Sequence, residues 1–172
     1  MRRLPVALVL TLAALPLVAA GCSKPVDLKE TLQVTDLAGG YHDAGVVEGR
    51  NKVVPSISFR LKKSTDDSLR PLSVNIVFKQ LPKAGMAVAP GQPAENDWDE
   101  VFKQSVPFSG NQTDLLTVRT PAGYTGDPPQ SRADMLKHSQ FRDMRVHIFA
   151  KHSSSQWVEI AQYDLPRQLL TQ

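Results

Sequence analysis

Four carboxylates flank Trp98 in the acidic segment at residues 95–100. Clustered oxygens are the ligands that calcium prefers, so Asp97 and Asp99 are candidates for a cation site. A calcium loop of the EF-hand type needs another oxygen ligand and then a glycine, and the apolar residues 101–102 occupy those two positions. The sequence therefore favours a solvated acidic loop with the tryptophan folded onto the edge of the domain.

Two Met-x-x-His pairs could bind a soft metal ion. Met135 and His138 are three residues apart in a segment expected to be helical, which places both on one face. Met144 and His147 have the same spacing in an expected strand, where an odd separation puts them on opposite faces. Thioether and imidazole ligands suit copper, but only the first pair could chelate it. The simpler interpretation places Met135 in the core, with the histidines as ordinary strand or surface residues, and no cofactor is expected.

Three aromatic residues, Tyr41, Trp98 and Tyr124, lie in segments that we expect to be loops. Aromatic loop residues at one end of a β-sandwich can form a binding face for carbohydrate or for a protein partner. In the alternative, each ring packs its own loop against the core. The sequence leaves both interpretations open.

Signatures of catalysis are missing from the sequence. It contains no Gly-x-Ser-x-Gly, Ser-x-x-Lys or His-Glu-x-x-His motif and no phosphate-binding loop. We therefore expect a protein that is not an enzyme. An unrecognised hydrolase is kept only as a third hypothesis, because scattered Ser, His and Asp residues could meet in space.

The first residues of the chain have the three parts of a secretory signal. Two arginines come first, an apolar run follows at residues 4–20, and small residues precede a possible cleavage site. The run is interrupted by Pro5 and Pro16 and is short for a helix that spans a bilayer. We expect residues 1–21 to be a cleaved signal peptide.

The string Val-Ala-Ala-Gly-Cys at residues 18–22 resembles the lipobox of bacterial lipoprotein precursors. The resemblance implies that the thiol of Cys22 is diacylated and that its new amino group is acylated. It also implies that a signal peptidase recognises Ala19, Ala20 and Gly21 and cuts just before Cys22. Several acyl chains anchor a protein stably to a lipid membrane, where one chain binds only marginally.

The lipobox also bears on compartment and on stability. In diderm bacteria, Ser23 after the lipidated cysteine implies passage to the periplasmic side of the outer membrane. Cys22 is the only cysteine, so an intramolecular disulfide is impossible. An exported domain without a disulfide must be held together by its core.

Length and charge bound the remaining possibilities. The chain has 172 residues, of which 41% are hydrophobic and 22% charged, as expected for one globular domain. Its 20 Lys+Arg fall to 18 without the two signal-peptide arginines, against 17 Asp+Glu, so no nucleic-acid partner is expected. We expect a lipidated cysteine, a tether and a possible first strand near Leu32–Leu37 within residues 22–45. We then expect a turn at Gly39–Gly40, followed by a β-sandwich domain at residues 46–172.

Apolar and polar residues alternate in several later segments, which is typical of strands with one buried face. The clearest alternating sets are Ile57/Phe59/Leu61, Val74/Ile76/Phe78, Leu116/Val118 and Val146/Ile148/Ala150. One short helix is expected at Arg132–His138, with Ser131 as its cap and Asp134 completing a capping box. The pattern predicts a mainly β protein, an immunoglobulin-like antiparallel β-sandwich with one short helix.

A second resemblance covers about half of the mature chain that remains after the expected cleavage. The segment Val53–Lys62, followed by Leu72–Phe78, is similar to the paired strands of FxLYD-type bacterial domains. Residues 109–112, followed by 115–118, resemble their turn before a strand. Because FxLYD-type domains are immunoglobulin-like, the resemblance supports the fold, and it implies no active site.

The sequence thus predicts a lipoprotein that faces the periplasm and is bound to a lipid membrane through Cys22. Its domain is expected to be a non-catalytic interaction or assembly module with an envelope protein as partner. The alternative is a ligand-binding module for glycan or a metal ion, which would use the loop aromatics and the carboxylates.

Overall fold

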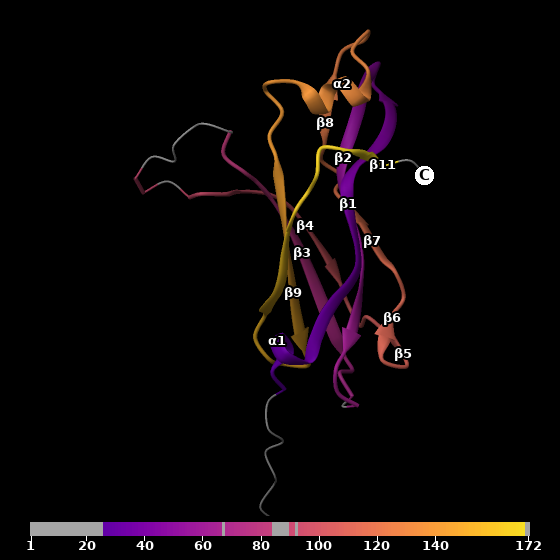
Figure 1. The fold of residues 1–172 in the computed structure, drawn as a ribbon, viewed down its shortest axis with the longest axis vertical. Coiled ribbons are helices and arrows are strands. Elements are labelled where there is room, and N and C mark those ends of the chain that lie inside the picture. The colour runs from indigo at the N-terminus through magenta and orange to yellow at the C-terminus, as the bar shows by residue number, and fades with distance from the viewer. Residues whose placement is uncertain (1–25, 67, 84–89, 92, 171–172) are drawn as a thin grey trace, which may run out of the picture.

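The computed structural model of the chain describes residues 26–66, 68–83, 90–91 and 93–170. These residues form two packed β-sheets and two short helices (Figure 1). The prediction of a mainly β sandwich is confirmed, with one more short helix than expected. No helix in this part of the chain is both long enough and apolar enough to cross a membrane.

The first sheet is built on a long antiparallel hairpin of β1 (Leu32–Val47) and β2 (Arg50–Lys63). The other edge of β2 pairs in turn with β8, β7 and β6, and β5 pairs with β6. Strand β11 runs parallel to β1 on the opposite edge. The bounds of these shorter strands are β5 (Phe108–Ser109), β6 (Gln112–Thr113), β7 (Leu116–Arg119), β8 (Tyr124–Gly126) and β11 (Leu169–Leu170).

The second sheet has the order β10-β9-β3-β4, and all its neighbours are antiparallel. Its strands are β3 (Leu72–Gln80), β4 (Asn96–Lys103), β9 (Met144–His152) and β10 (Val158–Asp164). Strands β9 and β10 form a hairpin, and the serines at residues 153–155 lie in the connection between them. Strands β4 and β10 are the two edges of this sheet.

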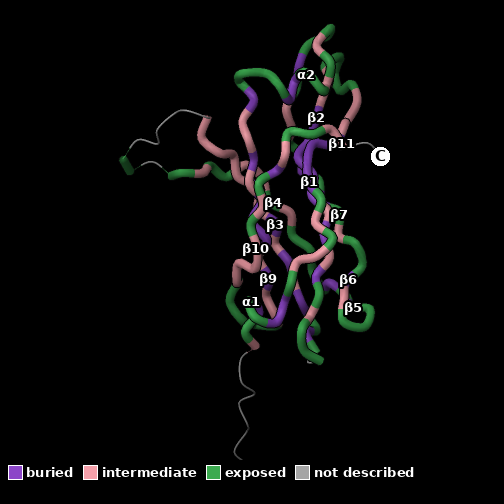
Figure 2. The backbone as a smooth tube through the Cα atoms, in the orientation of Figure 1, coloured by how far each residue is buried: buried purple, intermediate pink, exposed green. Residues whose placement is uncertain are grey.

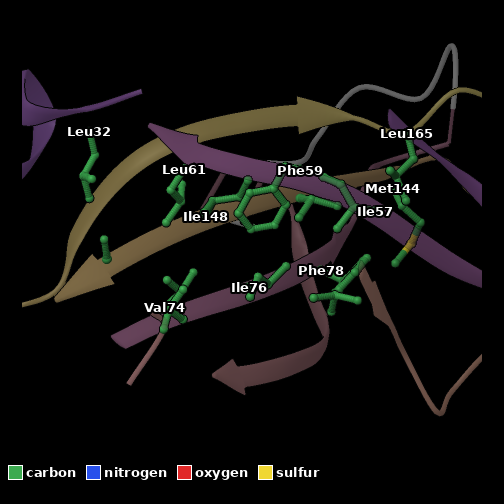
Figure 3. Close-up of a cluster of buried hydrophobic side chains, with 14 of the residues drawn as sticks. Leu32, Ile57, Phe59, Leu61, Val74, Ile76, Phe78, Met144, Ile148 and Leu165 are labelled. Carbon is green, nitrogen blue, oxygen red and sulfur yellow. The ribbon is translucent and has the colours of Figure 1, made fainter. Parts of the chain in front are cut away.

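The alternating residues build the core between the sheets (Figure 3). Buried residues follow the inner strands, and exposed ones are frequent in the loops (Figure 2). The fully buried members of the alternating sets are Ile57, Phe59, Leu61, Val74, Ile76, Val146, Ile148 and Ala150, together with Phe78. Burial of one large apolar side chain contributes about 1.5–3 kcal/mol, so this core can hold the domain without a disulfide.

Strand β1 corrects one prediction. The expected turn at Gly39–Gly40 is wrong, because β1 continues through it to Val47. A Cβ at Gly39 would lie 2.6 Å from Cδ2 of Leu165 and 2.9 Å from Cε1 of Tyr163. A glycine is therefore required because residues at the end of the other sheet pack directly on the backbone of β1.

The two helices lie at opposite ends of the sandwich (Figure 1). Helix α1 (Leu28–Thr31) is capped by Asp27 and packs against β9 and β10. Helix α2 (Arg132–Lys137) confirms the predicted helix, since the hydroxyl of Ser131 accepts a hydrogen bond from the Asp134 amide. Helix α2 lies beside the turn of the β1–β2 hairpin, where it helps to form a pocket.

Candidate functional site

A pocket of about 330 Å³ lies at the α2 end of the sandwich. It is formed by β8, by the loop that follows, by α2 and by the segment after the helix. The residues that matter most for its chemistry are Tyr124, Asp127, Gln130, Met135, His138 and Phe141. Small-molecule sites occupy roughly 300–1,000 Å³, so this pocket is at the lower limit of that range.

Aromatic side chains from three strands and one loop gather beside this pocket. Trp98 of β4 stacks on Tyr124 of β8, with ring centroids 5.3 Å apart. Tyr41 of β1 meets the ring of Tyr124 edge-on, with centroids 6.3 Å apart. Phe141 lies 4.4 Å from Tyr124 and 4.9 Å from Tyr41, also between ring centroids. We call these four residues the aromatic cluster.

The aromatic cluster favours the second interpretation of Tyr41, Trp98 and Tyr124, in which the rings pack against the core instead of forming an exposed binding face. All three lie on strands rather than loops, Tyr41 is fully buried, and Trp98 and Tyr124 are half-buried against the core. Of the three, only Tyr124 lines the pocket. Its hydroxyl accepts a hydrogen bond from Gln80 Nε2 at 3.1 Å and donates one to the Arg142 carbonyl at 3.0 Å. Tyr124 therefore offers the pocket its ring, because its hydroxyl is engaged elsewhere.

Met135 and His138 both line the pocket, as their predicted place on one helix face allows. Met135 is buried, and a Cβ added at Gly126 would lie 3.1 Å from its sulfur. His138 is exposed, and its Nδ1 accepts a hydrogen bond from the Gln140 amide at 3.2 Å. The thioether thus packs in the core, as the simpler interpretation predicts, while the imidazole lies at the rim.

The acidic segment is an edge strand, and the prediction of a loop there is wrong. Asp97 Oδ1 lies 3.4 Å from Lys79 Nζ, and Asp99 accepts a hydrogen bond from the Glu100 amide at 2.9 Å. Charged side chains are common on edge strands, where one side meets solvent. Across the described ranges, no three His, Cys, Asp or Glu side chains come together in a way that could hold a metal ion.

Polar contacts fix α2 on the β1–β2 hairpin. Arg132 of α2 forms an ion pair with Asp43 of β1 and donates a hydrogen bond to Asn51 Oδ1 of β2 at 2.7 Å. The amide of Asn51 in turn donates to the carbonyl of Gln130 at 2.7 Å. Because these contacts join the pocket wall to the hairpin, the pocket is pre-formed.

The end of β1, directly before the hairpin turn, carries two exposed apolar residues that belong to no sequence motif. Val46 is 63% exposed and Val47 is 40% exposed. Val46 pairs with Asn51, which holds the pocket residue Gln130, so the valines and the pocket are neighbours. We call Val46, Val47 and the pocket together the α2-end surface. The available signal was two adjacent apolar residues directly before a Glu-Gly turn.

A charge network lies on the outer face of the second sheet. His147 Nε2 lies 2.8 Å from Glu95 Oε2, and its Nδ1 lies 3.1 Å from Glu159 Oε1. Arg145 binds the other oxygen of Glu95 at 2.9 Å and forms a two-bonded ion pair with Asp164. The hydrogen bonds from Arg145 lower the pKa of Asp164 below its usual value. Both ring nitrogens of His147 therefore face a carboxylate oxygen.

This charge network fixes one segment of the chain to another. Glu95 directly precedes β4, whereas Arg145 and His147 belong to β9, two strands away in the sheet. His147 points away from Met144, which is fully buried in the core, so the predicted opposite faces are confirmed. Each charged group of the network pairs with another member, which favours a structural role.

Tyr41→Phe is expected to raise the free energy of unfolding by about 1 kcal/mol at neutral pH. The hydroxyl of Tyr41 is buried and has no hydrogen-bond partner among the described residues. Burial also raises the pKa of Tyr41 well above its usual value. Above pH 10 the unfolded chain therefore ionises this phenol while the folded protein does not, and stability falls as pH rises.

Urea unfolding at pH 7 and over pH 9–11.5 checks this expectation. The phenylalanine variant should lose stability less steeply than the wild type above pH 10. A residual slope is expected from Tyr124, because burial raises its pKa as well. Equal slopes, or a variant that is less stable at pH 7, would contradict this account of Tyr41.

The predicted lipidation site Cys22 and the recognition residues Ala19, Ala20 and Gly21 lie outside the described residues, so the lipobox stays a prediction. The resemblance to FxLYD-type domains also stays a prediction. Comparison of the chain with known protein families, with curated proteins and with solved structures finds no match.

Proposed function

We propose that this protein is a lipoprotein of the bacterial envelope, anchored by acyl chains on Cys22. Its sandwich acts as a non-catalytic interaction module that offers the α2-end surface to a protein partner. The lipobox resemblance of residues 18–22 supports the anchor. The opposite positions of α1 and α2 support anchoring at one end of the sandwich and partner binding at the other.

The anchor and the α2-end surface are separated by the length of the sandwich. The described chain starts at Val26, beside α1 and four residues after Cys22. Four residues span at most about 14 Å, so an anchor at Cys22 keeps the α1 end close to the lipid. Strand β1 has 16 residues, and at about 3.3 Å per residue it covers up to ~50 Å between the two ends.

The observation that carries the proposed interaction is the exposed apolar end of β1 beside a pre-formed pocket. Single exposed valines are ordinary, but Val46, the more exposed of the two, pairs with Asn51 and so shares the face of the hairpin on which Arg132 of α2 is held, while Val47 projects from the opposite face. Charged residues border them, including Arg50, which pairs with Asp127 at 2.7 Å. A small apolar centre with a polar rim is the usual composition of a protein–protein interface.

A second candidate function is the binding of a small ligand, such as a glycan unit, in the pocket itself. The pocket volume of about 330 Å³ and the rings of Tyr124 and Phe141 on its wall favour this candidate. Thermal-shift measurements with cell-wall sugars, calcium and copper separate it from the first proposal. A flat response to all of them would contradict ligand binding in the pocket.

Cys22→Ala is expected to abolish palmitate labelling, to leave the precursor uncleaved and to block lipid anchoring. The reason is that the thiol is the acceptor of the first lipid group in the proposed pathway. Metabolic labelling and immunoblotting of cell fractions measure all three outcomes. Labelling that persists in the alanine variant would contradict the anchor.

Photo-crosslinking in cells tests the interaction surface separately. A crosslinking amino acid at Val46 is expected to yield a discrete adduct of higher mass. The matched control is Thr117, an exposed residue on β7 of the same sheet, which should yield none. Equal adducts at both positions, or none at Val46, would contradict the α2-end surface as the binding site.

A further inference from the structure

The outer face of the second sheet carries an exposed aromatic pair at the α1 end. All aromatic residues of the chain are described, and of these only Phe102 at 52% and Trp157 at 40% are exposed. Their ring centroids are 5.7 Å apart in an edge-to-face arrangement. The ammonium group of Lys151 lies 5.7 Å from the centroid of the Trp157 ring. The pair is therefore a contact between β4 and the turn that precedes β10 rather than two isolated exposed side chains.

The strand register places a third ring on the same face. Asn75 of β3 pairs with Phe102 of β4 on one side and with Phe149 of β9 on the other. Directly paired residues project from the same face of a sheet, so Phe149 shares this face and is half-exposed. We call Phe102, Phe149, Trp157 and Lys151 the aromatic–lysine patch.

The aromatic–lysine patch lies at the end of the molecule from which the N-terminal tether leaves. Trp157 directly precedes β10, in the turn after β9, and α1 packs against both of these strands. Figure 1 shows α1 beside this turn, at the opposite end from α2. Only about 14 Å of extended chain separates Val26 from Cys22, so an anchored molecule keeps this turn close to the lipid.

The position of the patch near the proposed anchor favours a lipid surface over a protein partner. A lipid surface needs no large interface area, because the anchor already holds the patch at high effective concentration. Tryptophan with lysine is also a typical composition for residues in the headgroup region of a bilayer.

We infer that the aromatic–lysine patch inserts into the headgroup region of the bilayer that holds the anchor. The sandwich is then tilted, so that the outer face of its second sheet contacts the membrane at the α1 end instead of the whole sandwich projecting straight from the membrane. Glu100 and Glu159 lie on the same face as Lys151, so this face has no excess of positive charge and aromatic insertion provides the contact. This inference rests on the proposed anchor at Cys22.

The two tryptophans of the chain provide the test, because they lie in different environments. Trp157 belongs to the patch, whereas Trp98 is stacked in the aromatic cluster. The acylated full-length mature protein is reconstituted into vesicles of phosphatidylethanolamine and phosphatidylglycerol, with and without bromine on the acyl chains near the headgroups. Trp98→Phe leaves Trp157 as the only tryptophan, and Trp157→Phe leaves Trp98.

Brominated lipid is expected to quench the emission of Trp157 and to leave the emission of Trp98 unchanged. Phe102→Ala in the Trp98→Phe background should reduce the quenching, because the ring pair is broken. Should Trp98→Phe fail to fold, the difference between the wild type and Trp157→Phe gives the quenching of Trp157.

Flotation of the vesicles separates the failure of this inference from the failure of the anchor. Protein that floats with the vesicles but shows no quenching of Trp157 leaves the anchor intact and overturns the patch. Equal quenching of both tryptophans overturns the proposed tilt. Protein that does not float overturns the anchor, and the inference about the patch falls with it.

Discussion

Phe141→Ala is expected to lower the free energy of unfolding by about 3–5 kcal/mol, the usual cost of a buried Phe→Ala change. Phe141 is 5% exposed and contacts Tyr41 and Tyr124 in the aromatic cluster. The Arg167 guanidinium also lies 5.3 Å from the centroid of its ring. Removal of the ring leaves these partners facing a void, and the void joins the pocket that Phe141 lines.

Phe102→Ala is the matched control, since it deletes the same side chain from a residue that is 52% exposed. It is expected to lower the free energy of unfolding by less than about 1 kcal/mol, as surface substitutions usually do. Urea unfolding followed by far-ultraviolet circular dichroism measures both variants. If the two substitutions lower the free energy of unfolding by the same amount, the aromatic cluster does not have the stabilising role assigned to it.

Glu95→Gln is expected to lower the free energy of unfolding by about 2 kcal/mol, because hydrogen bonds to charged groups contribute about 1.5–3 kcal/mol each. Both oxygens of Glu95 are engaged, one by Arg145 and the other by His147. Its side chain is only 18% exposed, so solvent does little to replace these partners. The amide keeps the shape of the carboxylate but points an N–H group at one of the two donors.

Glu100→Gln controls for the loss of one negative charge from the same strand region. Glu100 is exposed and accepts a single long hydrogen bond from Asn75 at 3.4 Å. Its replacement should change stability by less than about 0.5 kcal/mol. Thermal and urea unfolding compare the variants, and amide hydrogen exchange at Asn96 and Asp97 should quicken only in Glu95→Gln. A Glu95→Gln variant as stable as the wild type would show that the charge network contributes nothing net.

The strands of the core can be predicted from the local sequence pattern. In β2, β3, β7 and β9, apolar residues recur at every second position, and a period of two has one structural solution when one face is buried. The helix at Arg132–Lys137 is equally local, because Ser131 supplies its cap from the adjacent residue. These features need no knowledge of what packs against them.

Other features depend on residues far away in the chain and could not be predicted from local pattern. Gly39 indicates a turn until Tyr163 and Leu165 are known to lie on it. Tyr41 and Trp98 have polar and glycine neighbours typical of loops, yet tertiary packing places both in strands. The spacing of charges in residues 95–100 is compatible with a loop or with an edge strand, and only the pairing of β4 with β3 decides between them.

The candidate site shows the same division. The helical spacing of Met135 and His138 predicts that they share a face, and both line the pocket. Their different roles depend on Gly126 and Gln140, which the spacing does not identify as neighbours. The exposed Val46 at the end of β1 becomes notable only because α2, from a distant part of the chain, lies next to it.

The acidic edge of the second sheet has a consequence for how copies of this protein coexist. Among the described residues, β4 is an edge strand with one unpaired side, and Asp97, Asp99 and Glu100 lie along it. If two such edges approached each other, carboxylates would face carboxylates across the new ladder, and like charges in that position repel. If the proposed anchor confines copies of the protein to one membrane plane, they collide often in a fixed orientation, which favours pairing through such edges. The negative charge of β4 opposes this pairing.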